Sequence, residues 1–153
     1  MIIIIEGPDG SGKTTLAEQI STQTGYPIEH RSKPETEEDR AKMHEDYINL
    51  VMSNRNVILD RCWYSEIVYG MVMRDQSYIS YDDMYAFEEL LADNGGGIII
   101  HCTGATSTLW DRCKKRGEDY ITSKSDFTEI CSLYDDLMSE PHIIPVVQYE
   151  YSN

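Results

Sequence analysis

The chain has 153 residues, and 27 Asp and Glu against 13 Lys and Arg give it a formal net charge of −14. That length fits one domain, residues 1–153, with enough chain to build a hydrophobic core. The charge argues against a nucleic-acid or anionic membrane surface as a partner, because binding to phosphate backbones depends on Lys and Arg. We therefore expect the few cations to gather around one cleft.

Short apolar stretches alternate with helix-like stretches along the chain. In chain order we predict a strand at residues 2–6, a helix at 13–23, a strand at 28–31, a helix at 35–53, a strand at 57–59, helices at 65–73 and 82–93, a strand at 98–102, helices at 109–116 and 126–139, and a strand at 143–147. This alternation is typical of an α/β fold with a mostly parallel sheet and helices on both faces. Pro145 cannot donate to a ladder, which predicts that the last strand lies at an edge. The N-terminal apolar stretch is five residues long and is interpreted as a buried strand, not a secretory signal.

The most informative motif lies between the first predicted strand and the first predicted helix. Residues 7–14 spell G-x-x-x-x-G-K-[ST], the pattern of a loop whose backbone N–H groups hold phosphates. The helix N-terminus behind it adds about half a positive charge. We expect Lys13 to reach the β and γ phosphates and the Thr14 hydroxyl to bind Mg²⁺. The motif predicts a nucleoside triphosphate site that contains Gly7, Asp9, Gly10, Ser11, Gly12, Lys13, Thr14 and Thr15.

Charged residues follow two other predicted strands. Arg31 and Lys33 come at the end of the second strand, and Asp60 and Arg61 end the third. Ligands of such sheets bind outside the carboxyl ends of the strands, so these residues and the phosphate loop should face one crevice. Asp60 could hold Mg²⁺ or accept a proton from an attacking oxygen. Arg61 could bind a phosphate with its fork of donors, the alternative being a structural ion pair between the two.

Aromatic residues follow directly. Trp63, Tyr64 and Tyr69 could stack on a nucleobase, and Ser65 lies four residues before Tyr69, on the same helical face. Core packing is the commoner fate of an aromatic side chain. We take Tyr64, Ser65 and Tyr69 as candidate substrate-binding residues and expect at least one aromatic ring of the group at the ligand.

Four of the thirteen cations lie within residues 112–116. A solvated helix face is the usual explanation of such a run. In an acidic chain with a triphosphate site, we favour a lid, at about residues 112–125, that closes over the transferring phosphates.

The cysteines and histidines show no metal-ligand spacing. The cysteines lack a C-x-x-C pair, which favours buried free thiols in a reducing cytoplasm over zinc or a disulfide framework. The histidines are interpreted as structural or surface residues. These residues are Cys62, Cys102, Cys113 and Cys131, and His30, His44, His101 and His142.

Three blocks of the chain resemble the thymidylate kinases in order and spacing. The first is IEGPDGSGKTT at residues 5–15, the second is Asp60-Arg61 with Ser65 and Tyr69-Gly70, and the third runs from Leu109 to Arg112 and on to Arg116-Gly117-Glu118-Asp119. Residues 62–66 of the second block, CWYSE, depart from the usual surroundings of the acceptor in that family. The resemblance covers most of the chain and is specific within these blocks. It implies a three-layer P-loop kinase fold, with a five-stranded, mostly parallel sheet in the order 2-3-1-4-5, helices on both faces and a lid.

The resemblance also implies roles for individual residues. ATP would be the phosphoryl donor, bound by the phosphate loop. Asp9 would lie near the acceptor sugar and phosphate, Asp60 and Arg61 would serve the acceptor phosphate and Mg²⁺, and Arg112 would pack on adenine. The candidate catalytic residues are Lys13, Asp9, Asp60, Arg61 and Arg116.

Arg116 enters this set because a glycine follows the acid of the loop, at Gly10. Members of this kind usually carry the catalytic cation in the lid, and Lys115 and Lys114 are the next candidates. These kinases usually continue through another helix after the last strand. One flank of the sheet is therefore expected to be bare or covered by a second subunit in a homodimer. The short chain would suit a viral kinase acting in the host cytoplasm.

The favoured function is phosphorylation of a deoxynucleoside monophosphate by ATP, with dTMP as the first acceptor. Arg31, Lys33 and Arg61 are placed to bind an acceptor phosphate. A deoxynucleoside kinase is the alternative, and it would need Glu29 or Asp60 as a base for a sugar 5′-hydroxyl. A second alternative is an NTP-binding switch or NTPase module, which would lack a pocket for a second substrate.

Overall fold

The computed structural model describes residues 1–31, 34, 36–117, 120–121 and 123–151. Every predicted helix and strand is present, in the predicted order. The elements are β1 (Ile2–Glu6), α1 (Lys13–Thr24), β2 (Ile28–His30), α2 (Glu37–Met52), β3 (Val57–Asp60), α3 (Trp63–Arg74), α4 (Tyr81–Asp93), β4 (Gly97–Thr103), α5 (Thr106–Lys115), α6 (Lys124–Ser139) and β5 (Val146–Glu150).

The five strands form one parallel sheet in the order β2-β3-β1-β4-β5, which confirms the expected P-loop kinase topology. The central strand β1 pairs with β3 so that Ile5 lies opposite Asp60, and with β4 so that Glu6 lies opposite His101. Parallel strands end at the same edge of a sheet. This register therefore brings the loop after β1, the end of β3 and the end of β4 together.

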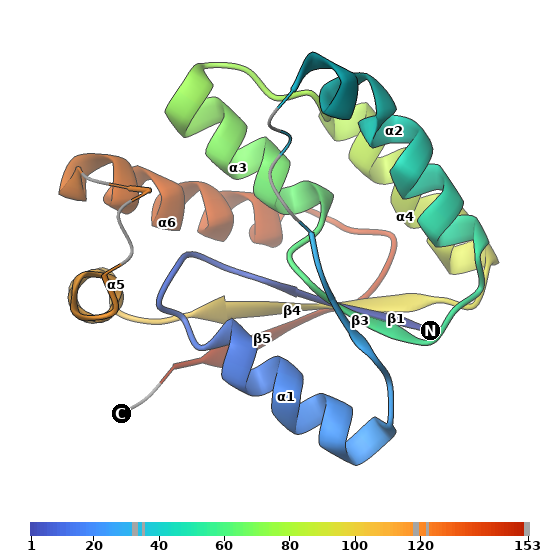
Figure 1. Cartoon of the computed structure of the whole chain (residues 1–153), viewed down its shortest axis with the longest axis horizontal. Helices are drawn as coiled ribbons and strands as arrows, with labels where there is room; N and C mark the ends of the chain where they lie inside the picture. The colour runs from blue at the N-terminus through green and yellow to red at the C-terminus, as the bar shows by residue number, and fades with distance from the viewer. Residues whose placement is uncertain (32–33, 35, 118–119, 122, 152–153) are drawn as a thin grey trace.

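The helices cover the two faces of the sheet unequally. Helix α1 lies on one face, and α2, α3, α4 and α6 lie on the other (Figure 1). A small apolar cluster that contains Ile5, Ala17, Ile58 and Cys102 lies between α1 and the sheet, and a much larger cluster fills the opposite side. The prediction of helices on both faces is confirmed, with most of the hydrophobic core on the side away from α1.

The last strand differs from its prediction. It begins at Val146 and ends at Glu150, three residues later than expected at each end. Pro145 stays outside the strand, although its carbonyl accepts a hydrogen bond from Ile99 N at 2.9 Å. The edge position is confirmed. Val147 and Tyr149 of β5 remain 47% and 40% exposed.

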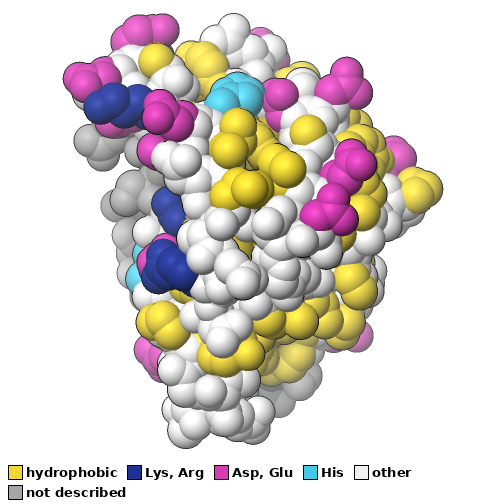
Figure 2. Space-filling view, turned by 90° about the vertical axis from the view of Figure 1, so that its right-hand side faces the viewer, with side chains coloured by type: hydrophobic (Ala, Val, Ile, Leu, Met, Phe, Trp, Pro, Cys, Tyr) yellow, Lys and Arg dark blue, Asp and Glu magenta, His cyan; other side chains and the backbone are white. Residues whose placement is uncertain are grey.

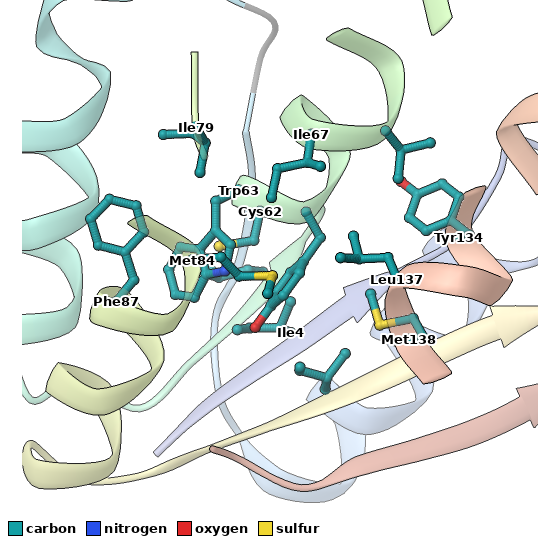
Figure 3. Packing of buried hydrophobic residues seen from close by; sticks show 14 of the residues in the cluster. Ile4, Cys62, Trp63, Ile67, Ile79, Met84, Phe87, Tyr134, Leu137 and Met138 are labelled. Carbon is teal, nitrogen blue, oxygen red and sulfur yellow. The ribbon is translucent and has the colours of Figure 1, made fainter. Parts of the chain in front are cut away.

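Aromatic packing positions the helix that follows β3. Helix α3 begins at Trp63, two residues earlier than predicted, and Trp63 is fully buried (Figure 3). Its ring meets Tyr47 of α2 edge-on, with centroids 5.4 Å apart, and lies 5.1 Å from Phe87 of α4. Edge-to-face and tilted pairs at these distances are the favoured arrangement of aromatic rings. Trp63 therefore joins α2, α3 and α4 immediately after the charged end of β3.

Tyr64 lies in this core as well, and the structure does not bring it to the crevice where we predicted it. Its hydroxyl donates to Glu88 at 2.9 Å, and the backbone N–H of Ile143 donates to the other oxygen of that carboxylate at 2.8 Å. His142 contacts Glu88 through Nδ1 and the Leu137 carbonyl through Nε2, each at 2.8 Å. A buried carboxylate is stable only when such partners surround it. Tyr64 therefore helps to hold α3, α4 and the segment before β5 together.

The cysteines, the apolarity of the helices and the distribution of surface charge were also predicted from composition. None of the four cysteines forms a disulfide and all four are buried, as predicted. No helix within the described residues is long and apolar enough to span a membrane. On the face seen in Figure 2, the Lys and Arg side chains lie toward one side, whereas Asp and Glu are spread over the surface.

Candidate active site

The phosphate loop, residues 7–14, joins β1 to α1 and is closely packed from two sides. A Cβ atom on Gly7 would lie 2.3 Å from the Cys102 carbonyl oxygen of β4. A Cβ atom on Gly10, whose φ is +81°, would lie 2.6 Å from the Leu109 carbonyl oxygen of α5. Only glycine fits these positions. The loop is therefore held between β4 and α5, with the N-terminus of α1 behind it.

Lys13 is buried at the first position of α1. Its Nζ donates to the Pro8 carbonyl at 2.9 Å, so the side chain folds over the loop. Burial, followed by the charge of Arg61, lowers the pKa of Lys13 to about 8, although Asp9 and Asp60 oppose the shift. The loop therefore carries a cation whose charge is incompletely balanced, and an anionic ligand would stabilise it.

Two side-chain oxygen groups, a hydroxyl and a carboxylate, meet where α1 faces the end of β3. Thr14 Oγ1 donates to Asp60 Oδ2 at 3.2 Å, and His30 Nδ1 lies 3.1 Å from the same oxygen. A hydroxyl and a carboxylate are hard oxygen ligands of the kind that Mg²⁺ prefers, together with phosphate oxygens and water. Within the described ranges, no group of three or more His, Cys, Asp and Glu side chains is arranged to hold a metal.

The sequence analysis interprets His30 as a structural or surface residue, and the structure places its ring beside the Asp60 carboxylate. The register of β2 against β3 sets His30 opposite Asp60. That pairing depends on strand register, which spacing along the chain does not reveal.

Arg61 stands at the centre of a cluster that also contains Asp9, Ser65, Tyr69 and Tyr134. Its guanidinium pairs with Asp9 and donates to the hydroxyls of Ser65, Tyr69 and Tyr134 at 3.2 to 3.3 Å. It also lies over the Tyr69 ring, 4.9 Å from the centroid. The predicted neighbours Asp9, Ser65 and Tyr69 are thus brought together with Arg61 in this Arg61 cluster.

The backbone of Arg61 adopts a φ of +76°, which is uncommon for a residue with a side chain. Such conformations cost about 1–3 kcal/mol and persist where the surroundings fix them, often at functional sites. Burial alone lowers the pKa of Arg61, but Tyr69, Tyr134, Asp9 and Glu6 together hold that pKa well above its ordinary value. Arg61 is therefore a permanent cation held in a set orientation beside the phosphate loop.

Glu6 supports this cluster and was not among the predicted site residues. The carboxylate accepts from the backbone N–H groups of Cys62 and Ser65 at 2.9 Å, and from the hydroxyls of Ser65 at 2.5 Å and Tyr134 at 3.2 Å. Burial raises the pKa of Glu6, although Arg61 and these donors oppose the shift. Glu6 fixes the start of α3 and the Tyr134 hydroxyl. The sequence feature that could have identified Glu6 is the single charged residue at the end of an apolar strand. Tyr134 lies 128 residues from Glu6 in the chain, and no feature of the sequence links the two residues.

A cavity of about 320 Å³ adjoins Asp60 through His30. It lies between the end of β2 and α2, and it is lined by His30, Arg31, Pro34, Asp39, Lys42, Met43, Asp46 and Tyr47. Its size is at the lower end of the range of small-molecule pockets, roughly 300–1,000 Å³. The predicted substrate residue Arg31 lines it and donates to Glu29 at 3.1 Å, whereas Lys33 lies outside the described residues.

The cations of the basic segment, residues 112–116, have different surroundings in the structure. Arg112 donates to the Gly10 carbonyl of the phosphate loop, which places it at the predicted donor site. Lys114 donates to the Ile121 carbonyl at 3.0 Å and lies over the Trp110 ring at 4.5 Å. Arg116 caps the end of α5 and is exposed. Residues 112–115 are helical, and residues 118, 119 and 122 of the predicted lid lie outside the described residues.

The parallel sheet with its 2-3-1-4-5 order, the phosphate loop and the adjoining Asp60–Arg61 pair define a P-loop kinase. A family model described as polyphosphate kinase 2 (PPK2) matches residues 1–119. The chain therefore belongs to the polyphosphate kinase 2 family.

Two findings connect the chain to one relative from Bacillus subtilis (strain 168). The SPbeta prophage-derived uncharacterized protein YorR is 30% identical over 138 residues, which make up 90% of this chain and 82% of YorR. A crystal structure of YorR in complex with phosphorylated GDP matches with a TM-score of 0.78 at 27% identity, over 99% of this chain and 85% of that one.

More distant structures share the fold alone. Deoxyadenosine kinase from M. mycoides with bound dATP matches with a TM-score of 0.64 at 20% identity, over 98% of this chain and 91% of that one. Thymidylate kinase from Candida albicans matches with a TM-score of 0.60 at 16% identity, over 99% and 84%. The match to the polyphosphate kinase 2 model and the likeness to YorR confirm the predicted P-loop kinase class, and the narrower assignment to the thymidylate kinases stays a prediction.

Proposed function

We propose that the chain transfers the γ-phosphoryl group of ATP to a deoxynucleoside monophosphate, with dTMP as the first acceptor to test. The observation that carries this proposal is the cavity beside Asp60, with Arg31 and Lys42 in its wall. A switch or NTPase module needs no second pocket next to its phosphate loop. Arg31 Nε is buried and has no hydrogen-bond partner among the described residues, so it is available to an acceptor phosphate.

The charges favour a monophosphate over a nucleoside as acceptor. A nucleoside needs a carboxylate base for its 5′-hydroxyl. Glu29, one candidate for that base, is paired with Arg31 at 3.1 Å and with Arg55 at 2.5 Å. Asp60, the other candidate, is engaged with Thr14 and His30. A monophosphate needs cations instead, and Arg31 and Arg61 supply them.

The residues of the site have separate roles in this reaction. Lys13 exchanges its bond to the Pro8 carbonyl for the phosphates of ATP. Thr14 and Asp60 would hold Mg²⁺, which supplies charge neutralisation on the phosphates when bound. Arg61, oriented by Asp9, binds the acceptor phosphate. An oxygen of that phosphate forms a bond to the γ-phosphorus while the bond between that phosphorus and the β–γ bridging oxygen breaks, and ADP leaves with the electron pair.

A panel of acceptors tests the function. Purified protein with ATP and Mg²⁺ is incubated with nucleosides and nucleoside monophosphates, including dTMP and GMP, and the products are resolved by ion-exchange chromatography. We expect diphosphate products from monophosphates. Phosphorylation of free deoxynucleosides alone would favour the nucleoside kinase, and ATP hydrolysis unaffected by every acceptor would favour the NTPase module.

Nucleotide binding should weaken as the pH rises through the pKa of Lys13. The phosphates bind the protonated amine, and the pKa of about 8 in the free protein means that this form is lost above that pH. Affinity for ADP should fall about tenfold between pH 7 and pH 9, because each pH unit above the pKa costs roughly a factor of ten. Calorimetric titration at a series of pH values measures this affinity. Lys13→Gln should bind weakly at every pH, and a parallel decline in this variant would contradict the assignment.

Arg116 is the proposed catalytic cation of the lid. Arg116 directly follows α5. Four residues further on, the centroid of the Tyr120 ring lies 6.3 Å from the centroid of the Tyr69 ring in the Arg61 cluster. Arg116→Ala should therefore lower kcat by about 10²-fold and change ATP binding little, because the charge acts on the transferring phosphoryl group. Steady-state kinetics measure kcat and the KM for ATP, and Lys124→Ala, at an exposed cation at the start of α6, is the control that should leave both unchanged. Wild-type turnover in Arg116→Ala would identify the segment as a solvated helix end.

The setting of the protein is proposed from its thiols and its surface. Four buried cysteines that form no disulfide suit a reducing compartment, and we propose the cytoplasm, that of the host if the chain is viral. The flank of the sheet at the edge strand β5 is expected to be either bare or covered by a second subunit. A homodimer through this flank stays a proposal, and the exposed side chains of Val147 and Tyr149 lie there.

A further inference from the structure

A histidine that takes no part in the reaction proposed above is buried near the end of β4. His101 is 1% exposed, and neither of its ring nitrogens has a hydrogen-bond partner among the described residues. A buried polar group without a partner costs free energy, and an apolar side chain of similar shape would avoid that cost. The histidine therefore needs an explanation other than core packing.

The His101 ring is connected to the Arg61 cluster through Tyr134. The two rings are stacked, with their centroids 6.2 Å apart and their planes 26° apart. The Tyr134 hydroxyl donates to Glu6 at 3.2 Å and accepts from Arg61 at 3.3 Å. The packing of His101 therefore helps to set the position of a hydroxyl that orients the Arg61 guanidinium.

Two carboxylates lie near the His101 ring. Glu6 is its neighbour in the ladder between β1 and β4, and Asp135 Oδ1 of α6 lies 3.8 Å from Nε2. The Asp135 side chain is 64% exposed, and 3.8 Å is longer than a charge-assisted hydrogen bond, which is about 2.7–2.9 Å. A proton on the ring would attract Asp135, and the carboxylate has room to approach.

The neutral form of the ring is favoured in the structure as it stands. Burial lowers the pKa of His101, and Asp135 opposes the shift. Among the described residues, the other titratable groups that face the ring are Glu6 and Tyr134, while β5 places the uncharged Gln148 opposite His101. Burial raises the pKa of Tyr134 well above its ordinary value, so its hydroxyl stays protonated.

We propose that His101 is a positioning residue of the acceptor site that acts through Tyr134, and that a proton on its ring releases the Arg61 cluster. The inference rests on the proposed role of Arg61 in binding the acceptor phosphate. An imidazolium would draw the Asp135 carboxylate to Nε2 and would offer Glu6 a second cationic partner. Both changes disturb Tyr134, which directly precedes Asp135 in α6 and contacts Glu6 through its hydroxyl. Acceptor binding should therefore weaken at the pH at which His101 takes up its proton.

NMR signals of isotope-labelled histidine and arginine test this coupling without any substrate. The ring signals of His101 report its proton, and the Nε signal of Arg61 reports the cluster. We expect both to change at one midpoint, below the ordinary histidine value of about 6.5. Asp135→Asn removes a carboxylate that favours the proton and should move both midpoints to lower pH. Asp136→Asn, at the next and also exposed position of α6, is the matched control and should move neither.

The acceptor KM is then measured over the same pH range with the acceptor identified by the panel. His101→Phe keeps a ring against Tyr134 and has no proton to gain. Each pH unit below the midpoint should raise the acceptor KM of the wild type by up to about tenfold relative to His101→Phe. The comparison cancels the protonation of the acceptor phosphate itself, which has a pKa of about 6. The KM for ATP should show no such difference between the two proteins.

Two results would overturn the inference. One is an Arg61 signal that does not follow the proton of His101, and the other is an acceptor KM with the same pH profile in the wild type and His101→Phe. Asp135→Asn, a change at an exposed position, carries the test if His101→Phe does not fold. An Arg61 signal that follows His101 in a protein that phosphorylates no monophosphate would support the coupling and contradict only the proposed function.

Discussion

Replacing Lys13 by alanine is expected to lower turnover by about 10²–10³-fold, the usual effect of removing one preorganised group that stabilises transition-state charge. In the free protein, the amine has no carboxylate within salt-bridge distance in the described structure and donates to a single carbonyl, that of Pro8. Its lowered pKa shows that burial already disfavours the charge. The side chain is therefore poorly satisfied without a ligand, which is expected of a group whose partner is a phosphate.

The same reasoning predicts that the fold survives the change. Alanine removes a buried charge that the protein stabilises incompletely, and alanine is the best helix former at the start of α1. Turnover is measured with ATP and the acceptor identified by the panel, and circular dichroism with thermal unfolding reports the fold. Lys124→Ala, at the start of α6, is the control and should act like the wild type. Activity of Lys13→Ala within about threefold of the wild type would contradict the role of Lys13 and the proposed enzyme, given the expected size of the effect.

Local features of the fold and site could be predicted because their signals are contiguous. The phosphate loop needs its glycines and Lys13 in a fixed order within eight residues, since one turn forms the whole cradle. Likewise, Asp60 and Arg61 directly follow an apolar strand. The sequence therefore placed the loop and the end of β3 correctly relative to the sheet.

Helix phase explains why Tyr64 lies away from the Arg61 cluster. Ser65 and Tyr69 are four residues apart and share a face of α3, and both contact Arg61. Tyr64 and Tyr69 are five apart, which turns their side chains about 140° from one another on a helix with 3.6 residues per turn. Once Tyr69 faces Arg61, Tyr64 must face elsewhere, and its hydroxyl meets Glu88 in the core.

Other site residues could not be found because they depend on long-range packing. Tyr134 reaches Glu6 only after α6 packs on α3. His30 reaches Asp60 through strand register. His101 meets the Tyr134 ring only once α6 covers β4. Each contact joins elements whose pairing is decided by the assembled sheet, so no spacing within one segment encodes it.

Replacing Arg61 by alanine is expected to raise the KM for the monophosphate acceptor by about 10- to 100-fold while changing the KM for ATP by less than about threefold, since hydrogen bonds to charged groups contribute roughly 1.5–3 kcal/mol each. Without the guanidinium, Asp9 lacks its ion-pair partner and repels an incoming phosphate. Arg61→Lys keeps a charge but loses the planar fork that bridges Asp9, Tyr69 and Tyr134. Its acceptor KM should therefore fall between those of the wild type and Arg61→Ala.

The positive φ of Arg61 requires a control for the backbone. Alanine at a φ of +76° keeps the strain but loses the contacts that hold it, so Arg61→Gly is measured beside it. If the side chain binds the acceptor, both variants should show the same selective loss, although glycine relieves the strain. Arg55→Ala removes an exposed arginine that pairs with Glu29 before β3 and should leave both KM values unchanged. An equal rise in both KM values, or recovery of acceptor binding in Arg61→Gly, would contradict a phosphate-binding role. Arg61 would then act by holding the cluster together, and the acceptor phosphate would have to be bound from the cavity side, by Arg31 and Lys42.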